Sequence, residues 1–151
     1  MAFQALYSWD VRYSLTGDAS IPEGLLDFSW ALTTCGGPNE EMTAFSRLLV
    51  SGTLENIVSV DDMIQKHLKN WDLQRLNRVD LALLRMSVYA LMFQTDMPPT
   101  IVIDEAIGIS REFGTDDSYR FVNGILDSIR KTLASSPGQS TSKSDLTVLN
   151  P

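Results

Sequence analysis

The segment LNRVDLALLRMSVYALMF, residues 76–93, constrains the fold of this chain more than any other stretch. Its apolar residues recur at intervals of three and four, which is the period of an α-helix, and they form two stripes. The first stripe comprises Leu76, Val79, Leu83, Met86 and Ala90, and the second comprises Leu81, Leu84, Val88 and Leu91. A helix that is apolar on two sides lies in the centre of a fold, with neighbours on both sides.

The same helical period continues through most of the chain, and no run rich in Val, Ile and Thr is framed by hairpin turns. The sequence therefore predicts an all-α fold of about seven helices in two small packed bundles. We expect helices from residue 2 to the loop at 16–18, at about 23–32, 39–57, 60–70, 76–93 and 100–113, and from 115 onward.

Composition shifts along the chain suggest its organisation. We predict an N-terminal helical subdomain over 1–58 and a C-terminal helical subdomain over 59–135. The last stretch, 136–151, is polar, aperiodic and rich in Pro, Gly and Ser, which predicts a disordered tail.

Capping residues mark three of the expected helix starts. Asn39 precedes two glutamates and is a good N-cap for the helix at 39–57. Ser59 opens an acidic variant of the capping box for the next helix. Thr115 is expected to cap the last helix, with Asp116 and Asp117 in its first turn.

Two residues conflict with their predicted helices. Arg85 lies in the most apolar helix, where an unpaired charge would be costly, so we expect an ion pair with Asp104 or Glu105. Gly124 costs about 1 kcal/mol inside a helix. This glycine suggests close helix packing or, alternatively, contact with a ligand.

Several functional classes lack their characteristic residues. One cysteine and one histidine provide neither an internal disulfide nor a Cys/His zinc site, so no metal is expected. Glycine-rich phosphate loops and the Gly-x-Ser-x-Gly elbow are absent from the sequence, and no cofactor is expected. Adjacent carboxylates point about 100° apart on a helix and would not flank one bond. The sequence therefore predicts that the protein is not an enzyme.

The sequence also suggests a location in the cell. No run approaches the roughly 18 apolar residues of a membrane span, and no basic region followed by an apolar one opens the chain. We expect a cytoplasmic protein without membrane contacts.

Three stretches together resemble the NusB family of bacterial transcription antitermination factors. They are FQALYSWD near the start, LNRVDLALLRMSVYAL in the middle and DMPPTIVIDEAIGISREFGTDDSYRFVNGIL near the end. The resemblance covers about residues 2–131, with Asp104 in place of a commoner asparagine. It implies a seven-helix fold in two bundles, and binding to the boxA element of ribosomal RNA leader transcripts together with NusE, a small-subunit ribosomal protein. Contact with the RNA polymerase antitermination complex would be indirect, and a homodimer is expected when NusE is absent.

The resemblance also implies two sets of functional residues. The family's RNA surface maps onto Gln4, Tyr7, Asp117, Ser118, Arg120 and Phe121. The family's NusE contact maps onto Arg78 and Asp80. Tyr7 or Phe121 would stack on an unpaired base, worth about 1–3 kcal/mol per base, while Arg120 would meet a phosphate and Asp117 would accept from a base amino group. Phe121 as a packing residue and Asp117 as a helix-dipole residue are the alternative interpretations.

The family usually carries several Arg or Lys residues before the position that matches Met1. Here the chain opens inside an amphipathic pattern, and we expect a misassigned start codon. Residues 1–58 carry seven acidic and two basic residues. Without a basic segment, RNA affinity would suffer, which leaves a protein-only adaptor that binds NusE as the main alternative. A third alternative is the leading domain of a ribosomal RNA cytosine methyltransferase, which NusB-like domains resemble.

Overall fold

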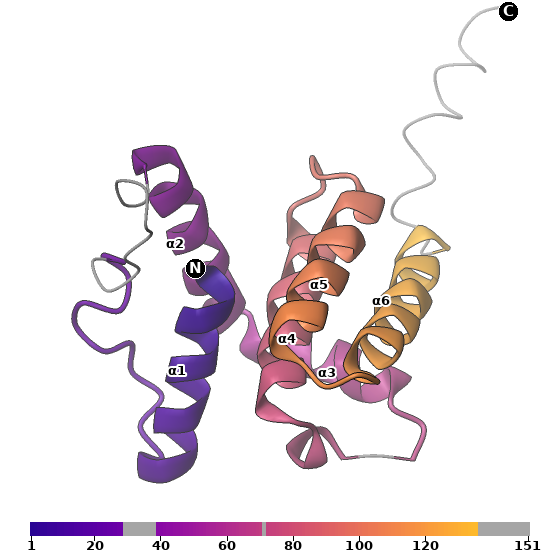
Figure 1. Cartoon of the computed structure of the whole chain (residues 1–151), viewed down its shortest axis with the longest axis horizontal. Coiled ribbons are helices and arrows are strands. Elements are labelled where there is room, and N and C mark those ends of the chain that lie inside the picture. The colour runs from indigo at the N-terminus through magenta and orange to yellow at the C-terminus, as the bar shows by residue number, and fades with distance from the viewer. Residues whose placement is uncertain (29–38, 71, 136–151) are drawn as a thin grey trace, which may run out of the picture.

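The computed structural model describes residues 1–28, 39–70 and 72–135. This part of the chain forms six α-helices and one short 3₁₀ helix, and it contains no β-strand (Figure 1). The elements are α1 (Ala2–Thr16), α2 (Glu40–Glu55), α3 (Ile57–His67), η1 (Leu73–Arg75), α4 (Arg78–Phe93), α5 (Pro99–Phe113) and α6 (Ser118–Ala134). The all-α prediction is confirmed, and the helix count is close to the expected seven.

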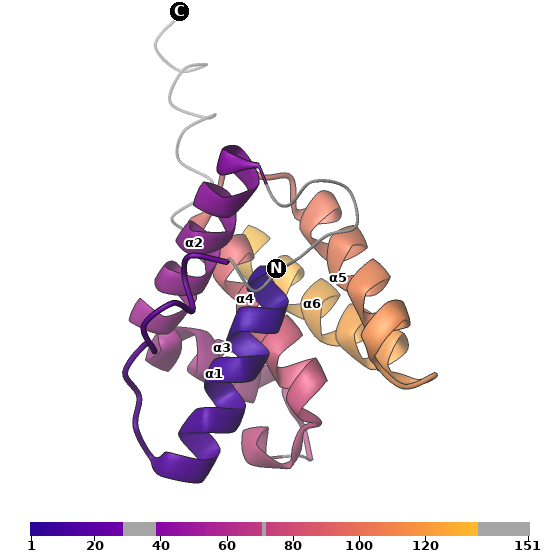
Figure 2. The ribbon, with the colours of Figure 1, turned by 60° about the vertical axis from the view of Figure 1, so that its left-hand side comes forward.

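Helix α4 is the centre of the fold, as its two apolar stripes predicted. It packs against each of the other five α-helices. Helices α1 and α2 lie on one side of α4, and α5 and α6 lie on the other side (Figures 1 and 2). Leu83, Leu84 and Val88 are fully buried in one connected core to which all six helices contribute.

Local signals explain several helix ends. Gly17 adopts φ 71°, a left-handed conformation that ends α1 and that glycine reaches without strain. The Asn39 side chain accepts a hydrogen bond from the Met42 backbone N–H at 2.7 Å, which confirms the predicted N-cap of α2. Asn77 caps α4 in the same manner, accepting from the Val79 N–H at 2.8 Å.

Two of the expected helix starts are wrong. Residues 23–27 form a turn rather than a helix, and the remainder of the expected helix beyond residue 28 lies outside the described residues. Phe28 is fully buried and has φ 57°, so its packing turns the backbone out of a helical path. Ser59 is already inside α3, because α2 leads almost directly into α3 through Asn56, which flanks both helices.

The two predicted subdomains are in contact. Helix α1 packs on α4, and α3 begins at Ile57, just before the expected boundary at 58/59. The division into subdomains stays an interpretation, and the expected tail at 136–151 lies outside the described residues. No helix in the described ranges is long and apolar enough to cross a membrane.

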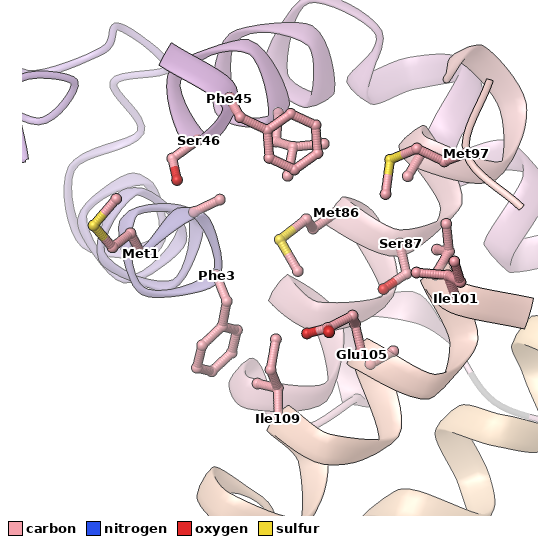
Figure 3. A pocket seen from close by; sticks show the side chains of 15 residues that line it. Met1, Phe3, Phe45, Ser46, Met86, Ser87, Met97, Ile101, Glu105 and Ile109 are labelled. Carbon is pink, nitrogen blue, oxygen red and sulfur yellow. The ribbon is translucent and has the colours of Figure 1, made fainter. Parts of the chain in front are cut away.

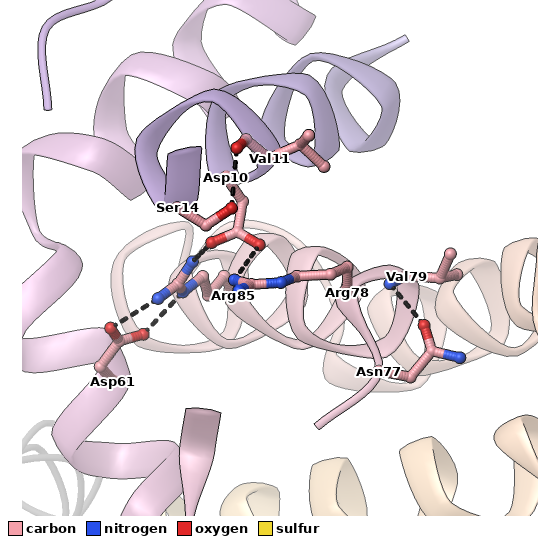
Figure 4. Close-up of polar contacts among 8 residues, drawn as sticks. All are labelled: Asp10, Val11, Ser14, Asp61, Asn77, Arg78, Val79 and Arg85. Carbon is pink, nitrogen blue, oxygen red and sulfur yellow. Dashed lines mark hydrogen bonds and ion pairs between the residues drawn. The ribbon is translucent and has the colours of Figure 1, made fainter. Parts of the chain in front are cut away.

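A cluster of four charged residues joins α1, α3 and α4 (Figure 4). The buried carboxylate of Asp10 accepts hydrogen bonds from Arg85 at 3.0 Å and from Arg78 at 2.8 Å. Arg85 also donates to both oxygens of Asp61 at 2.9 Å. Burial alone would lower the pKa of Arg85. The hydrogen bonds and negative charges of Asp61, and then of Asp10, have a larger opposite effect, so the pKa of Arg85 is raised.

The expectation that Arg85 forms an ion pair is therefore confirmed, but the expected partners were wrong. Asp104 and Glu105 lie on α5, whereas the Arg85 guanidinium donates to Asp10 of α1 and Asp61 of α3. The sequence pattern identified a buried charge without indicating which helix would face it.

Candidate functional site

A tight corner connects α5 to α6. The Ser118 hydroxyl accepts a hydrogen bond from the Thr115 backbone N–H at 3.0 Å and lies 3.0 Å from the Thr115 hydroxyl. A Cβ on Gly114 would come within 2.6 Å of the Ser110 carbonyl oxygen and 2.7 Å of the Ser118 Cβ. Glycine at 114 and the buried Ser118 side chain therefore hold this corner in shape.

The predicted cap of α6 is wrong. The helix begins at Ser118, so Thr115, Asp116 and Asp117 precede it, and no side chain caps its first turn. The Thr115 backbone N–H donates to the hydroxyl of Ser118, three residues later, so the corner has its own hydrogen-bonded turn in place of a side-chain cap. Asp116 and Asp117 are exposed on this turn.

Helix α1 adjoins the corner through one aromatic contact. The rings of Phe3 in α1 and Phe113 at the end of α5 are 5.4 Å apart, tilted at 42°. Gln4 follows Phe3 and is exposed, and Tyr7 is 39% exposed one turn further along α1. The contact joins the two segments that carry the predicted RNA-facing residues.

Two arginines surround a tyrosine beside the corner. The Arg111 guanidinium lies 4.9 Å from the centre of the Tyr119 ring, and that of Arg120 lies 5.6 Å from it. Arg120 Nε also donates to the Tyr119 hydroxyl at 3.0 Å, which is the main cause of a raised Arg120 pKa. Arg111 and Arg120 are exposed, so the cluster offers two cations and an aromatic ring to a ligand.

Sequence reasoning missed Arg111 and Tyr119. A usable signal was present, since Arg111 lies in the last turn of α5 and Tyr119 directly precedes Arg120. Each is therefore within one helical turn of the corner.

Phe121 faces a different part of the surface from Arg120. It is half-buried and borders a hollow of about 240 Å³ together with Arg75, Leu76, Asn77 and Asp80. This hollow lies between the start of α4 and the first turn of α6. The structure thus brings Phe121, predicted to contact RNA, beside Asp80, predicted to contact NusE.

Asp80 and Ser118 are more buried than their predicted roles suggested. Asp80 is 8% exposed, and its Oδ1 has no hydrogen-bond partner within the described residues. Burial raises the Asp80 pKa, and the Ser118 hydroxyl partly opposes this effect. Arg78 is 43% exposed and is held on one side by Asp10. The binding roles of these residues stay predictions.

No group of three or more His, Cys, Asp or Glu side chains within the described ranges is arranged to hold a metal ion. The corner, the Tyr119 cluster and the hollow contain hydrogen-bonding, cationic and aromatic groups instead. Such groups suit binding to another molecule.

Comparisons with known proteins identify the family. A sequence model of the NusB family matches residues 1–131. The transcription antitermination protein NusB of Treponema denticola is 50% identical over 131 residues, which cover 86% of this chain and 90% of that protein.

Solved structures agree with this match. NusB of T. maritima has a TM-score of 0.71 at 35% identity, covering 86% of this chain and 85% of that one. A crystal structure of the antitermination factors NusB and NusE in complex with double-stranded RNA has a TM-score of 0.69 at 25% identity. The likeness to this complex covers 87% of this chain and 91% of that chain.

These matches confirm the resemblance seen in the three sequence stretches. The relatives are transcription antitermination proteins, so the prediction that the chain is not an enzyme is also confirmed. The chain belongs to the NusB family.

Proposed function

We propose that this protein binds the boxA element of ribosomal RNA leader transcripts as a heterodimer with NusE, and so supports transcription antitermination. The observation that carries this proposal is the 5.4 Å contact between Phe3 and Phe113, because it joins α1 to the α5–α6 corner. A structural neighbour crystallised with NusE and double-stranded RNA supports both partners.

The exposed groups at the corner suit RNA. Protein surfaces recognise unpaired bases by stacking and by hydrogen bonds to base edges, and they neutralise phosphates with cations. Tyr7 provides an exposed ring, Gln4 an amide, and Asp117 an acceptor for a base amino group. Arg120 and Arg111 would bind phosphates.

NusE is proposed to bind around the start of α4, beside Arg78 and Asp80. The buried Asp80 Oδ1 has no protein donor in the described part of the chain, so a basic side chain of NusE would satisfy it. Phe121 borders the same hollow and would contact either partner. The antitermination complex of RNA polymerase would be reached through NusE, and a homodimer would form when NusE is absent.

A gel-shift titration of the protein with NusE, against boxA RNA and a scrambled RNA, tests the proposal. Arg120→Ala is expected to weaken boxA binding by about tenfold, since an arginine–phosphate contact is lost. Lys131→Ala removes the same charge from the last turn of α6 and is the matched control, with little expected change. Equal affinity for the two RNAs would contradict the proposal.

A protein-only adaptor that binds NusE is the second candidate, and one observation favours it. Arg12 is the one basic residue of α1, and it is engaged by Asp18 at 2.6 Å and by the Ser20 carbonyl oxygen at 3.0 Å. Helix α1 therefore offers little free positive charge to RNA. The adaptor predicts a shallow dependence of RNA affinity on salt, and a steep dependence would rule it out.

A further inference from the structure

An apolar groove is lined by residues of α1, α2, α4 and α5 (Figure 3). Its volume is about 350 Å³, which is within the range of ligand-binding clefts. Phe3, Phe45, Leu49, Met86, Met97 and Ile101 are among its lining residues. The groove runs along α5 from Ile101 to Ile109 and does not include Arg111, Tyr119 or Arg120, although Phe3, which contacts Phe113 at the corner, also lines it.

Apolar side chains at the groove remain accessible to solvent. Phe45 of α2 is 41% exposed and Ile101 of α5 is 49% exposed, one on each wall. Met86 and Met97 add flexible thioether side chains, which adapt to the shape of an apolar partner. Exposed apolar surface of this kind commonly marks an interaction site.

Among the described residues that line the groove, Glu105 has the one charged side chain. In Figure 3 its carboxylate points into the groove, between Met86 and Ile109. It makes no hydrogen bond or ion pair with any described residue. Asp104, the preceding residue on α5, is also exposed but does not line the groove. An apolar groove with one unpaired carboxylate fits an occupant that is apolar and carries a positive charge.

The surrounding charge argues against a second copy of this chain in the groove. Glu41 lies one turn before Phe45 on the same face of α2, and the whole chain has a net charge of −7. Two copies joined here would bring like charges together. A basic partner would instead complement both Glu105 and Glu41.

We propose that this groove binds an amphipathic helix of a partner protein, with its apolar face against Phe45 and Ile101 and a lysine or arginine paired with Glu105. Helices commonly bind in this way, through apolar side chains spaced three and four residues apart. This interaction goes beyond the proposed binding of RNA and NusE and does not depend on it.

Fluorescence anisotropy with a labelled synthetic helix tests the proposal. The probe has about 18 residues, or five turns, with leucine on one face and lysine on the other, and a control peptide carries glutamate in place of lysine. Glu105→Gln is expected to weaken binding of the lysine probe about three- to fivefold, as for a partly exposed ion pair. Phe45→Ala is expected to weaken it about tenfold through lost apolar burial.

Matched variants separate the groove from general attraction to an acidic protein. Asp104→Asn removes the neighbouring charge outside the groove, and Leu48→Ala removes an exposed side chain of α2 that does not line it. Both should bind the probe like the unmodified protein. The proposal is overturned if Asp104→Asn weakens binding as much as Glu105→Gln, or if Phe45→Ala has no effect. It is also overturned if sedimentation shows a dimer that Phe45→Ala dissociates, since a second copy would then cover the groove.

Discussion

Replacing Asp10 by asparagine tests whether the four-residue ion cluster stabilises the fold. Asp10 is 2% exposed and accepts from two arginines of α4, one on each carboxylate oxygen. An asparagine has nearly the same shape, but its carbonyl oxygen accepts from one arginine and its amide group then faces the other, donor against donor. Arg85 would carry most of the cost, because its side chain is 10% exposed, whereas Arg78 reaches water.

The size of the stability loss depends on the hydrogen bonds that Arg85 retains in the variant. Breaking a buried ion pair by removing one partner costs about 3–5 kcal/mol. Arg85 retains both hydrogen bonds to Asp61, so we expect Asp10→Asn to lower the free energy of unfolding by about 2–3 kcal/mol. With a slope of about 1.5–2 kcal/mol per molar urea, the midpoint of unfolding should fall by about 1–2 M.

Urea unfolding followed by far-UV circular dichroism measures this shift. Asp18→Asn is the matched control, because it breaks the Arg12–Asp18 pair at the surface, where water replaces the contact and little change is expected. In an Asp10→Asn background, Arg85→Met should cost less than it does alone, since it removes the stranded charge. A midpoint shift for Asp10→Asn no larger than that of the control would refute the reasoning.

Four further predictions concern single positions. Because burial raises the Asp80 pKa above its unfolded value, the charge destabilises the fold at neutral pH, so Asp80→Asn should raise the thermal midpoint at pH 7. The rise in thermal midpoint caused by Asp80→Asn should shrink as the pH falls to about 4. A rise that does not change with pH would contradict this prediction. Gly114→Ala should lower the free energy of unfolding by about 1–3 kcal/mol through overpacking at the corner. A Cβ at position 124 would meet nothing within 4 Å, so Gly124→Ala should raise the free energy of unfolding by up to about 1 kcal/mol. Urea unfolding measures the effects of both glycine substitutions. Asn39→Ala removes the cap of α2 and should cost about 1 kcal/mol in the same assay.

The central helix was predictable because its signal is local. Two apolar stripes over residues 76–93 indicated a helix with neighbours on both sides, and α4 occupies Arg78–Phe93 in that position. The Asn39 cap was predictable for the same reason, since its acceptor lies three residues from the donor.

Features set by distant residues were not predictable. The partners of Arg85 come from α1 and α3, and no pattern within α4 distinguishes those helices from α5. Phe28 is buried by tertiary packing, which overrides the helical pattern expected at 23–32. The expectation that Gly124 marks close helix packing was wrong, since it is exposed with open space where its Cβ would lie, while contact with a ligand stays a prediction.

The candidate site was partly predictable. Gln4, Tyr7 and Arg120 were expected to face RNA, and all three are exposed, but their contacts with RNA stay a prediction. It did not indicate the burial of Asp80 and Ser118, because both face the packing of α4 against α6, which depends on the angle between the helices. The Arg111–Tyr119 contact was missed because it joins two helices across the corner.

The ion cluster also bears on the order of folding events. Asp10 and Arg85 are 75 positions apart in the chain, whereas α4, α5 and α6 follow one another through short connections. Contacts between distant segments require the closure of long loops, so we expect α4, α5 and α6 to associate before α1 docks. Loss of the Asp10 contacts should then accelerate unfolding more than it slows refolding. The cluster therefore governs how long the folded state persists more than how fast it forms.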